Sequence, residues 1–563
     1  MLEHFDKPYF TDPLGDNTVD DPLGTEAPVM SLYRSVFPGI NNVVAFVRVY
    51  SAICWMVRQI DETASRKRNP DIAEISATGL EKIQLLLGWY NVRKEVRGLA
   101  GGGRVYPTGS KKTKLSVKVI VSPQHTKAKK LDPAFEPPVG ANFLQPVQYG
   151  PSIVNGMQFL CTTDIKGAYA LTAAGEKLAD AYERAIARSK WRQWLADLSK
   201  LHICNDEVAG MGTLLDLRKP SRAEVAAFLE QYYPVSDECI SLGPNWELRQ
   251  EGLTLALRAV FAEQKTRSYR HAVPENAIRF AMARACTHDG RYELRLEGCE
   301  QAQMWWASLL VRQYLRLAQS VMLRLTESWI HRAVALDKPR DILDCANGIG
   351  ADLLTLLPVN QSTSVGELAQ AIEEWRGEAA TLFAAGPWLK PAQRLESLFD
   401  NLMDVRFFAH NSKEEGRALR SCYVALVYCG LEARNFQGNS RFEQTLSNER
   451  LTLLKLSSIV EKHLTHSPAK FMAHIVQHYV VLQHFAVVQE RAARDGRSRY
   501  LFIKGDSGLQ RIGNDERFVG ADWMQDRLLH ALRLLSQCRL LTHDEDKNTF
   551  SLTKEGLARL DLA

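Results

Sequence analysis

The segment FLCTTDIKGAYALTAAGEKLADAYERAI, residues 159–186, has the pattern that decides the fold of the N-terminal part of the chain. Residues 159–163 favour a strand, residues 164–167 a turn, and residues 168–172 a returning strand. A helix is expected next, with Thr172 as its N-cap, because a threonine side chain can accept a hydrogen bond from a free backbone N–H group. The sequence therefore predicts a strand–turn–strand–helix unit here.

The same pattern returns at the end of the chain. FSLTKEGLARL (550–560) parallels YALTAAGEKLA (169–179). An amphipathic helix is predicted over residues 521–538, because leucines recur there at spacings of three and four. This strand–turn–strand–helix order resembles the wing and closing helix of winged-helix domains. We therefore predict two winged-helix-like modules, one N-terminal and one C-terminal.

Helical patterns dominate the rest of the chain. Apolar residues predict helices over 43–60, with Asn41 or Asn42 as the cap, and over 78–95. A helix capped by Ser221 and a long helix over 303–333 follow. The expected fold class is mainly α, a helical scaffold with two winged-helix-like α+β modules.

Four parts of the chain are expected. They are an acidic extended arm (1–30), an N-terminal helical and winged-helix-like domain with a basic loop (31–190), a helical middle domain (191–450), and a C-terminal helical and winged-helix-like domain (451–563).

The net charge of +5 hides an uneven distribution. Residues 1–30 contain seven acids and one base, whereas residues 91–130 contain eleven bases and only one acid, Glu95. The first segment therefore carries −6 and the second +10. A concentrated basic stretch in a nearly neutral protein indicates a local site for a polyanion.

We predict that this basic loop binds DNA, because proteins contact phosphate backbones mainly through lysine and arginine. We add two arginines of the predicted C-terminal helix to the set of DNA-binding residues, because they can reach phosphates. The predicted DNA-binding residues are Arg93, Lys94, Arg97, Arg104, Lys111, Lys112, Lys114, Lys118, Lys127, Lys129, Lys130, Arg527 and Arg533.

Enzymatic motifs are weak. Residues 341–352, DILDCANGIGAD, resemble the first motif of S-adenosylmethionine-dependent methyltransferases through Gly348 and Gly350. The rest of that fold is missing from the sequence, so a turn between two helices is the preferred interpretation. Segments 293–295 and 544–547 imitate a metal-dependent nuclease motif only loosely. We expect no catalytic residue, no cofactor and no metal.

Five histidines lie within residues 463–484. His474 and His478 share one face of a predicted helix, a spacing that can hold a metal ion. The glutamate that zinc peptidases need beside the first histidine is replaced by Ile475. Core or interface histidines are therefore preferred over a metal site.

The ten cysteines are scattered and form no CxxC pair, which excludes common zinc-ribbon and disulfide-scaffold patterns. No stretch reaches the roughly 20 apolar residues of a membrane helix, and no secretory signal is recognisable. The expected location is the bacterial cytoplasm.

The run LYRSVFPGINN (32–42), followed by Arg48, Tyr50, Ser51 and Trp55, resembles an N-terminal phrase of large uncharacterised bacterial proteins encoded in antiviral defence islands. DPLG at 12–15 and 21–24 matches their lead-in, and SRYLFI (498–503) a later phrase. The usual second tyrosine is Val49 here. The resemblance covers about the first 100 and last 80 residues and implies a subunit of a multi-gene system, without chemistry of its own.

Together these observations predict a non-enzymatic DNA-binding and scaffolding subunit of an anti-phage defence system. It would bind duplex or forked DNA and act with a separate helicase or nuclease. The first alternative is an enzyme, either a methyltransferase or a metal-dependent nuclease. The second is a protein–protein assembly adaptor.

Overall fold

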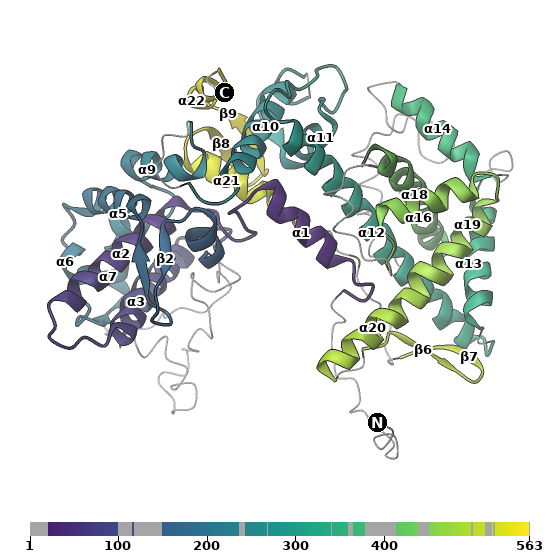
Figure 1. Ribbon diagram of the computed structural model, residues 1–563, viewed down its shortest axis with the longest axis horizontal. Helices are drawn as coiled ribbons and strands as arrows, with labels where there is room; N and C mark the ends of the chain where they lie inside the picture. The colour runs from purple at the N-terminus through teal and green to yellow at the C-terminus, as the bar shows by residue number, and fades with distance from the viewer. Residues whose placement is uncertain are drawn as a thin grey trace, which may run out of the picture. The chain divides into compact units, whose positions relative to one another are not determined.

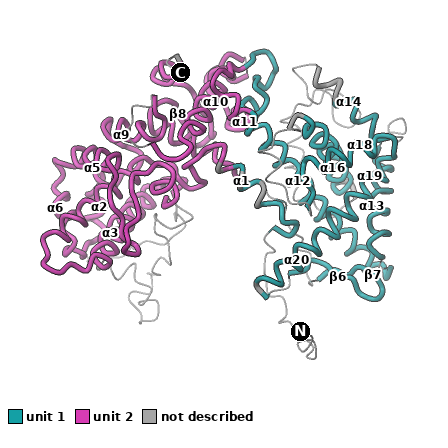
Figure 2. The backbone as a smooth tube through the Cα atoms, in the orientation of Figure 1, with its two compact units in different colours: residues 1–32, 280–293, 304–524 teal, residues 33–279, 294–303, 525–563 magenta. Residues whose placement is uncertain are grey.

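The computed structural model describes residues 21–99, 115–116, 149–235, 242–266, 268–338, 340–357, 364–377, 412–436, 450–496, 499–512, 521 and 524–561. This part of the chain is mainly helical with small sheets, which confirms the predicted class (Figure 1). It forms two compact units (Figure 2). Unit 1 comprises residues 1–32, 280–293 and 304–524, and unit 2 comprises residues 33–279, 294–303 and 525–563.

These units differ from the predicted linear domains. Unit 2 combines residues 33–279 with the C-terminal residues 525–563, and β5 (Val273–Pro274) pairs with β9 (Thr549–Leu552) within it. A sequence pattern reports local periodicity and contains no signal for a pairing over such a separation. The boundary between the units falls within α1 (Glu26–Val36), α11 (Glu275–Arg284) and α12 (Glu300–Ala335).

Unit 2 is built around the antiparallel helices α2 and α3. α2 begins later than predicted, after Phe46, and Phe46 makes no side-chain cap. Asn41 instead accepts a hydrogen bond from the N–H of Val43 in the preceding turn, at 3.1 Å. The helices of this unit are α2 (Val47–Ser65), α3 (Ile72–Arg93), η2 (Pro151–Gly156), α5 (Ala173–Ile186), α6 (Arg192–Ala196), α7 (Asn205–Ala209), α8 (Gly212–Leu215), α9 (Arg222–Tyr232), α10 (Trp246–Gln264), α21 (Leu528–Gln537) and α22 (Lys554–Asp561).

Both predicted strand–turn–strand–helix segments are present. β2 (Leu160–Thr162) pairs with β3 (Tyr169–Leu171) before α5, and β8 (Leu541–Asp544) pairs with β9 before α22. Thr172 accepts a hydrogen bond from the N–H of Gly175, as predicted, and Thr553 does the same for Gly556. The two segments therefore share one hydrogen-bonding arrangement.

The shared glycine is required in both segments. A Cβ atom on Gly175 would lie 2.0 Å from the carbonyl oxygen of Phe159, and one on Gly556 would lie 2.1 Å from that of Leu540. The helix can pack this closely on the hairpin only because no side chain intervenes.

We expect Gly556→Ala and Gly175→Ala each to lower the free energy of unfolding by about 1–3 kcal/mol, since a backbone carbonyl must move to admit the methyl group. Thermal unfolding measures the loss. Ala558→Ser and Ala173→Ser add one atom at exposed positions of the same two helices and should be neutral. Equal effects of the glycine and control variants would contradict the proposed packing.

The two hairpins differ in their sheets. β8 and β9 belong to a three-stranded sheet of order β5–β9–β8, with α10 packed against β9. β2 and β3 form a two-stranded sheet. A separate pair joins β1 (Leu115–Ser116) to β4 (His202–Ile203).

Unit 1 is a helical bundle with one hairpin. Its core includes the aromatic side chains of Tyr314, Tyr423 and Phe471. α12 is the long helix predicted over residues 303–333. The other elements are α13 (Ile342–Leu356), α14 (Val365–Gly377), α16 (Ser412–Glu432), η4 (Ala433–Phe436), α18 (Leu453–His463), α19 (Pro468–Ile475), η5 (Val476–Val481), α20 (Leu482–Asp495), β6 (Phe502–Gly505) and β7 (Gly508–Arg511).

The end of the predicted acidic arm is packed rather than extended. Asp21 accepts hydrogen bonds from the backbone N–H groups of Thr25 and Glu26, and α1 begins there. Leu23 is buried in the core of unit 1, and its carbonyl oxygen accepts a hydrogen bond from Gln483. The predicted extended arm is wrong for residues 21–30, because the buried side chain of Leu23 anchors this segment in the core. Residues 1–20 lie outside the described part.

A continuous helical stretch from Pro468 to Arg494 is long and apolar enough, by length and composition, to cross a membrane. The sequence alone predicts no such stretch. Within its most apolar window, 56% is buried inside the protein. The core helix of a soluble protein can have the same length and composition.

Candidate functional site

The described start of the basic loop is held firmly on unit 2. Val96 and Leu99 are buried just after α3, whereas Arg93, Lys94 and Arg97 are exposed. Further along, β1 pairs with β4. The basic loop is thus fixed to unit 2 at two places.

Two of the three exposed cations already have partners. Arg93 donates a hydrogen bond to the carbonyl oxygen of Asn205 at 2.8 Å, and Arg97 pairs with Asp546 at 3.0 Å. Both members of the second pair are more than half exposed, so the pair contributes little to stability and is easily exchanged for another anion. The predicted DNA-binding residues outside the described part are Arg104, Lys111, Lys112, Lys114, Lys118, Lys127, Lys129 and Lys130.

The two arginines predicted on the C-terminal helix point into unit 2. Arg527 donates a hydrogen bond to the carbonyl oxygen of Phe37 at 3.3 Å. Arg533 is half-buried and lies over Gly98, and burial lowers its pKa. No residue of α21 is classed as exposed. The structure therefore places this helix, and both arginines, in the packing of the unit.

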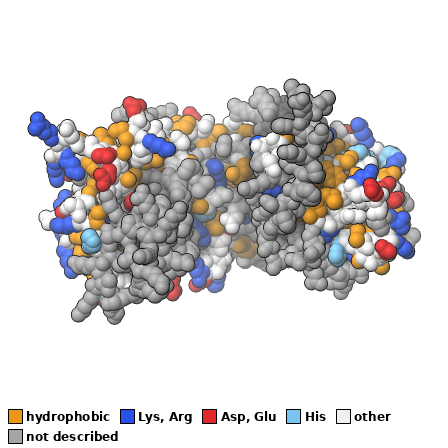
Figure 3. All heavy atoms as spheres, turned by 90° about the horizontal axis from the view of Figure 1, so that it is seen from below, with side chains coloured by type: hydrophobic (Ala, Val, Ile, Leu, Met, Phe, Trp, Pro, Cys, Tyr) orange, Lys and Arg blue, Asp and Glu red, His pale blue; other side chains and the backbone are white. Residues whose placement is uncertain are grey.

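The tips of the two hairpins differ in exposure and charge. Residues 161–167, around the tip of β2–β3, are all exposed and include Lys166. The tip of β8–β9 contains Asp544, Glu545, Asp546 and Lys547, and is net acidic. Elsewhere on the face drawn in Figure 3, both signs of charge are interspersed over the described side chains.

The residues that carry the family-like phrase form a buried polar network in unit 2. Arg48 donates to Glu224 at 2.8 Å and to two backbone carbonyl groups, and Ser51 donates to Glu224 at 2.6 Å. Tyr50 shares a hydrogen bond with Ser152, and Trp55 donates to Glu183. Burial alone would lower the pKa of Arg48, but the Glu224 carboxylate raises it above its ordinary value. Through these hydrogen bonds the residues hold the helices of unit 2 in position relative to one another.

Lys82 was not singled out in the sequence, yet it is buried. Its ammonium group donates to the carbonyl oxygens of Trp194 (2.6 Å) and Asp197 (2.9 Å), and lies 4.0 Å from the centroid of the Trp194 ring. Burial lowers its pKa to about 7. Because both carbonyl groups belong to the end of α6, Lys82 acts as a cap for that helix.

Four histidines of unit 1, His463, His466, His474 and His478, form a row. Ring centroids lie 5.2 Å apart between His463 and His466, 5.1 Å between His463 and His474, and 4.6 Å between His474 and His478. Burial lowers the pKa of His474 to about 4 and that of His463 below its ordinary value. Among the described residues, no three His, Cys, Asp or Glu side chains are arranged to hold a metal ion.

The methyltransferase-like segment is helical. Residues 342–356 form α13, capped by Asp341, so the expected turn between two helices is wrong, as is a strand ending in a glycine turn. A Cβ atom on Gly350 would lie 2.4 Å from the carbonyl oxygen of Ala469, and one on Gly348 would lie 2.5 Å from Trp329. The glycines allow α13 to pack closely, which explains them without a cofactor.

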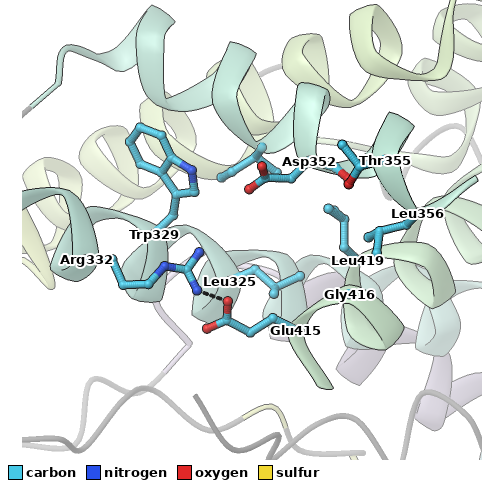
Figure 4. Close-up of a pocket in the computed structure, with 10 residues that line it drawn as sticks. Leu325, Trp329, Arg332, Asp352, Thr355, Leu356, Glu415, Gly416 and Leu419 are labelled. Atoms are coloured by element: carbon cyan, nitrogen blue, oxygen red, sulfur yellow. Dashed lines mark hydrogen bonds and ion pairs between the residues drawn. The ribbon is translucent and has the colours of Figure 1, made fainter. Parts of the chain in front are cut away.

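A cavity of about 410 Å³ lies in unit 1 between α12, α13 and α16 (Figure 4). Arg332 and Glu415 form an ion pair on one side, and Asp352 lies across the cavity from them. Ser328 also donates to Glu415, at 2.6 Å. No local motif marks this site, because its residues come from three separated helices.

Comparisons of the chain with protein-family models, with curated proteins and with solved structures found no match.

Proposed function

We propose that the protein is a non-enzymatic, DNA-binding scaffolding subunit that contacts DNA through residues 91–130. The observation that carries the proposal is the concentration of eleven bases and one acid in this loop, fixed to unit 2 at α3 and at β1–β4. So many cations in one stretch of sequence raise the local positive potential. The exposed Arg97–Asp546 pair can open to release its arginine to a phosphate.

The C-terminal elements support a winged-helix interpretation. Helix α10, strand β5, helix α11, helix α21 and the hairpin β8–β9 follow in the order of a winged-helix domain, and the sheet order β5–β9–β8 also fits. In this interpretation residues 304–524 are an insertion before α21. Thr172 and Thr553 each accept a hydrogen bond from the N–H of a glycine three residues later, so the interpretation extends to the N-terminal hairpin.

The DNA contacts belong on the basic loop rather than on α21 in this proposal. In helix-turn-helix proteins the recognition helix needs exposed side chains to enter the major groove. The side chains of α21 are buried or only partly exposed, and the neighbouring hairpin tip is acidic. The same observations favour a second candidate function for the C-terminal module, contact with another protein.

The membership of an antiviral defence system, with a helicase or nuclease as partner, remains a prediction from the N-terminal phrase. Arg48, Tyr50, Ser51 and Trp55 of that phrase are buried and hydrogen-bonded. Such a resemblance would therefore concern the packing of the core of unit 2, because none of these side chains is available to a ligand.

Replacing Lys111, Lys112 and Lys114 with alanine tests the proposal. Each lost phosphate contact should flatten the log–log dependence of DNA affinity on salt by roughly 0.9, so the triple variant should lose up to about 2.7 of slope. Fluorescence anisotropy with a labelled duplex, titrated at several salt concentrations, measures this change.

Arg66, Lys67 and Arg68, replaced together by alanine, provide the control. These exposed bases remove the same charge from the turn between α2 and α3, where Glu62 already pairs with Arg66. The salt slope should stay close to that of the unmodified protein. If the lysine variant behaves like this control, DNA binding through the loop is refuted and the adaptor function is favoured.

A further inference from the structure

The cavity of unit 1 has the size and composition of a small-molecule site. Its volume of about 410 Å³ falls within the roughly 300–1,000 Å³ typical of ligand pockets. Its wall is mixed: five large apolar side chains and Gly416 line it together with four polar residues, three of which are charged. It is lined by Leu325, Trp329, Arg332, Ile349, Asp352, Thr355, Leu356, Glu415, Gly416 and Leu419.

Two glycines shape the apolar wall. Gly348 leaves room for the edge of the Trp329 ring, since an added Cβ would lie 2.5 Å from it. Gly416 leaves room for Leu356, since an added Cβ would lie 2.8 Å from that side chain. The side chains of Trp329 and Leu356 can therefore pack against these glycines and line the cavity without filling it.

The charges of the cavity do not balance. Arg332 is neutralised by Glu415, a carboxylate that is 8% exposed and also accepts a hydrogen bond from Ser328. Among the described residues, Asp352 has neither a hydrogen-bond nor an ion-pair partner for its carboxylate. Burial raises the pKa of Asp352, although Arg332 opposes the shift. Asp352 is exposed where it lines the cavity, so a carboxylate without a basic partner among the described residues faces the solvent there.

The geometry points to a binding site for a small organic cation, with its ammonium group at Asp352 and its apolar body against Trp329. The carboxylate supplies the counter-charge, and the Trp329 ring offers an apolar surface against which the alkyl part of the ligand can pack. An anion would meet the unpaired carboxylate without a free base, because Arg332 is already engaged by Glu415. This inference is independent of DNA binding.

Isothermal titration calorimetry with n-hexylamine, n-hexanoate and n-hexanol tests the site. The amine should bind most tightly, and Asp352→Asn should weaken it by about tenfold or more. The affinity of the unmodified protein should also fall as the pH is lowered through the raised pKa of Asp352, because the protonated carboxyl group no longer attracts a cation.

Asp344→Asn is the matched control, since Asp344 is an exposed carboxylate on the same helix outside the cavity. It should leave amine binding unchanged. Thr355→Tyr, at the exposed rim, should block the cavity and abolish binding even if Asp352→Asn proves unstable. Failure of hexylamine to bind, equal binding of hexanoate, or unchanged binding in both cavity variants would overturn the inference.

Discussion

Glu224→Ala should lower the free energy of unfolding of unit 2 by about 3–5 kcal/mol, the usual loss when one member of a buried ion pair is removed. Arg48 is 3% exposed and would keep its charge without the carboxylate that now accepts two of its hydrogen bonds. Ser51 and the backbone N–H of Ser221 would each lose the same acceptor. Urea unfolding followed by tryptophan fluorescence measures the loss.

The same helix provides the control. Glu230, on α9, pairs with Lys177 at 2.8 Å, the distance that also separates Arg48 from Glu224, but both members of the Glu230 pair are largely exposed. Glu230→Ala should cost no more than about 1 kcal/mol. The double variant Arg48→Met with Glu224→Leu should recover most of the stability, because no buried charge remains. Equal losses for the two single variants would show that burial does not govern the strength of these pairs.

The local parts of this fold could be predicted from the sequence. Thr172 and Ser221 cap their helices as expected, since capping depends on residues three positions apart. The C-terminal hairpin is present where the parallel between FSLTKEGLARL and YALTAAGEKLA predicts it, for the same reason. A turn, a threonine cap and a glycine three residues later are contiguous signals.

The errors concern contacts that local patterns do not encode. Gly348 and Gly350 imitate a cofactor loop, but Asp341 caps a helix there, and the glycines face Trp329 and Ala469, which are distant in the sequence. The pairing of β5 with β9, which joins residues 273–274 to the C-terminal hairpin in unit 2, is equally invisible to periodicity.

The candidate sites also differ in how much of each can be recognised from the sequence alone. The basic loop is a compositional signal and is visible in the sequence alone. The cavity needs Trp329, Asp352 and Glu415 from three helices, and only their packing brings them together. The histidine cluster is intermediate. Its members are close in sequence, but the row they form, and the lowered pKa of His474, depend on burial.

Acid should destabilise unit 1 well above the pH at which ordinary carboxylates titrate, because of His484. This residue is fully buried, and both ring nitrogens are used: Nδ1 bonds the carbonyl oxygen of Pro22 at 3.1 Å, and Nε2 accepts the N–H of Leu501 at 3.0 Å. Only the neutral ring can make both bonds. Burial lowers the pKa of His484 to about 4 from an ordinary value of 6.5, and Arg491 adds to the shift.

The sign of the effect follows from proton binding. As the pH falls below about 6.5, an unfolded histidine takes up a proton while folded His484 stays neutral, so the stabilisation present at neutral pH is lost progressively down to about pH 4. A shift of this size corresponds to about 3 kcal/mol. Urea unfolding at pH 7 and pH 5 should therefore differ in the unmodified protein, and the difference should shrink in His484→Gln, whose amide can serve both partners.

His331→Gln serves as the control, because His331 is exposed on α12 in the same unit. Its pH dependence should match that of the unmodified protein. Pro22 adjoins the segment that docks Leu23 in the core, so protonation of His484 should also loosen residues 21–24. The backbone amide of Gly24 bonds the carbonyl oxygen of Asp21, and its protection factor, the measured hydrogen-exchange rate relative to the intrinsic rate at the same pH, reports this loosening. An equal protection factor at pH 7 and pH 5 would separate the histidine from the anchoring of the N-terminal segment.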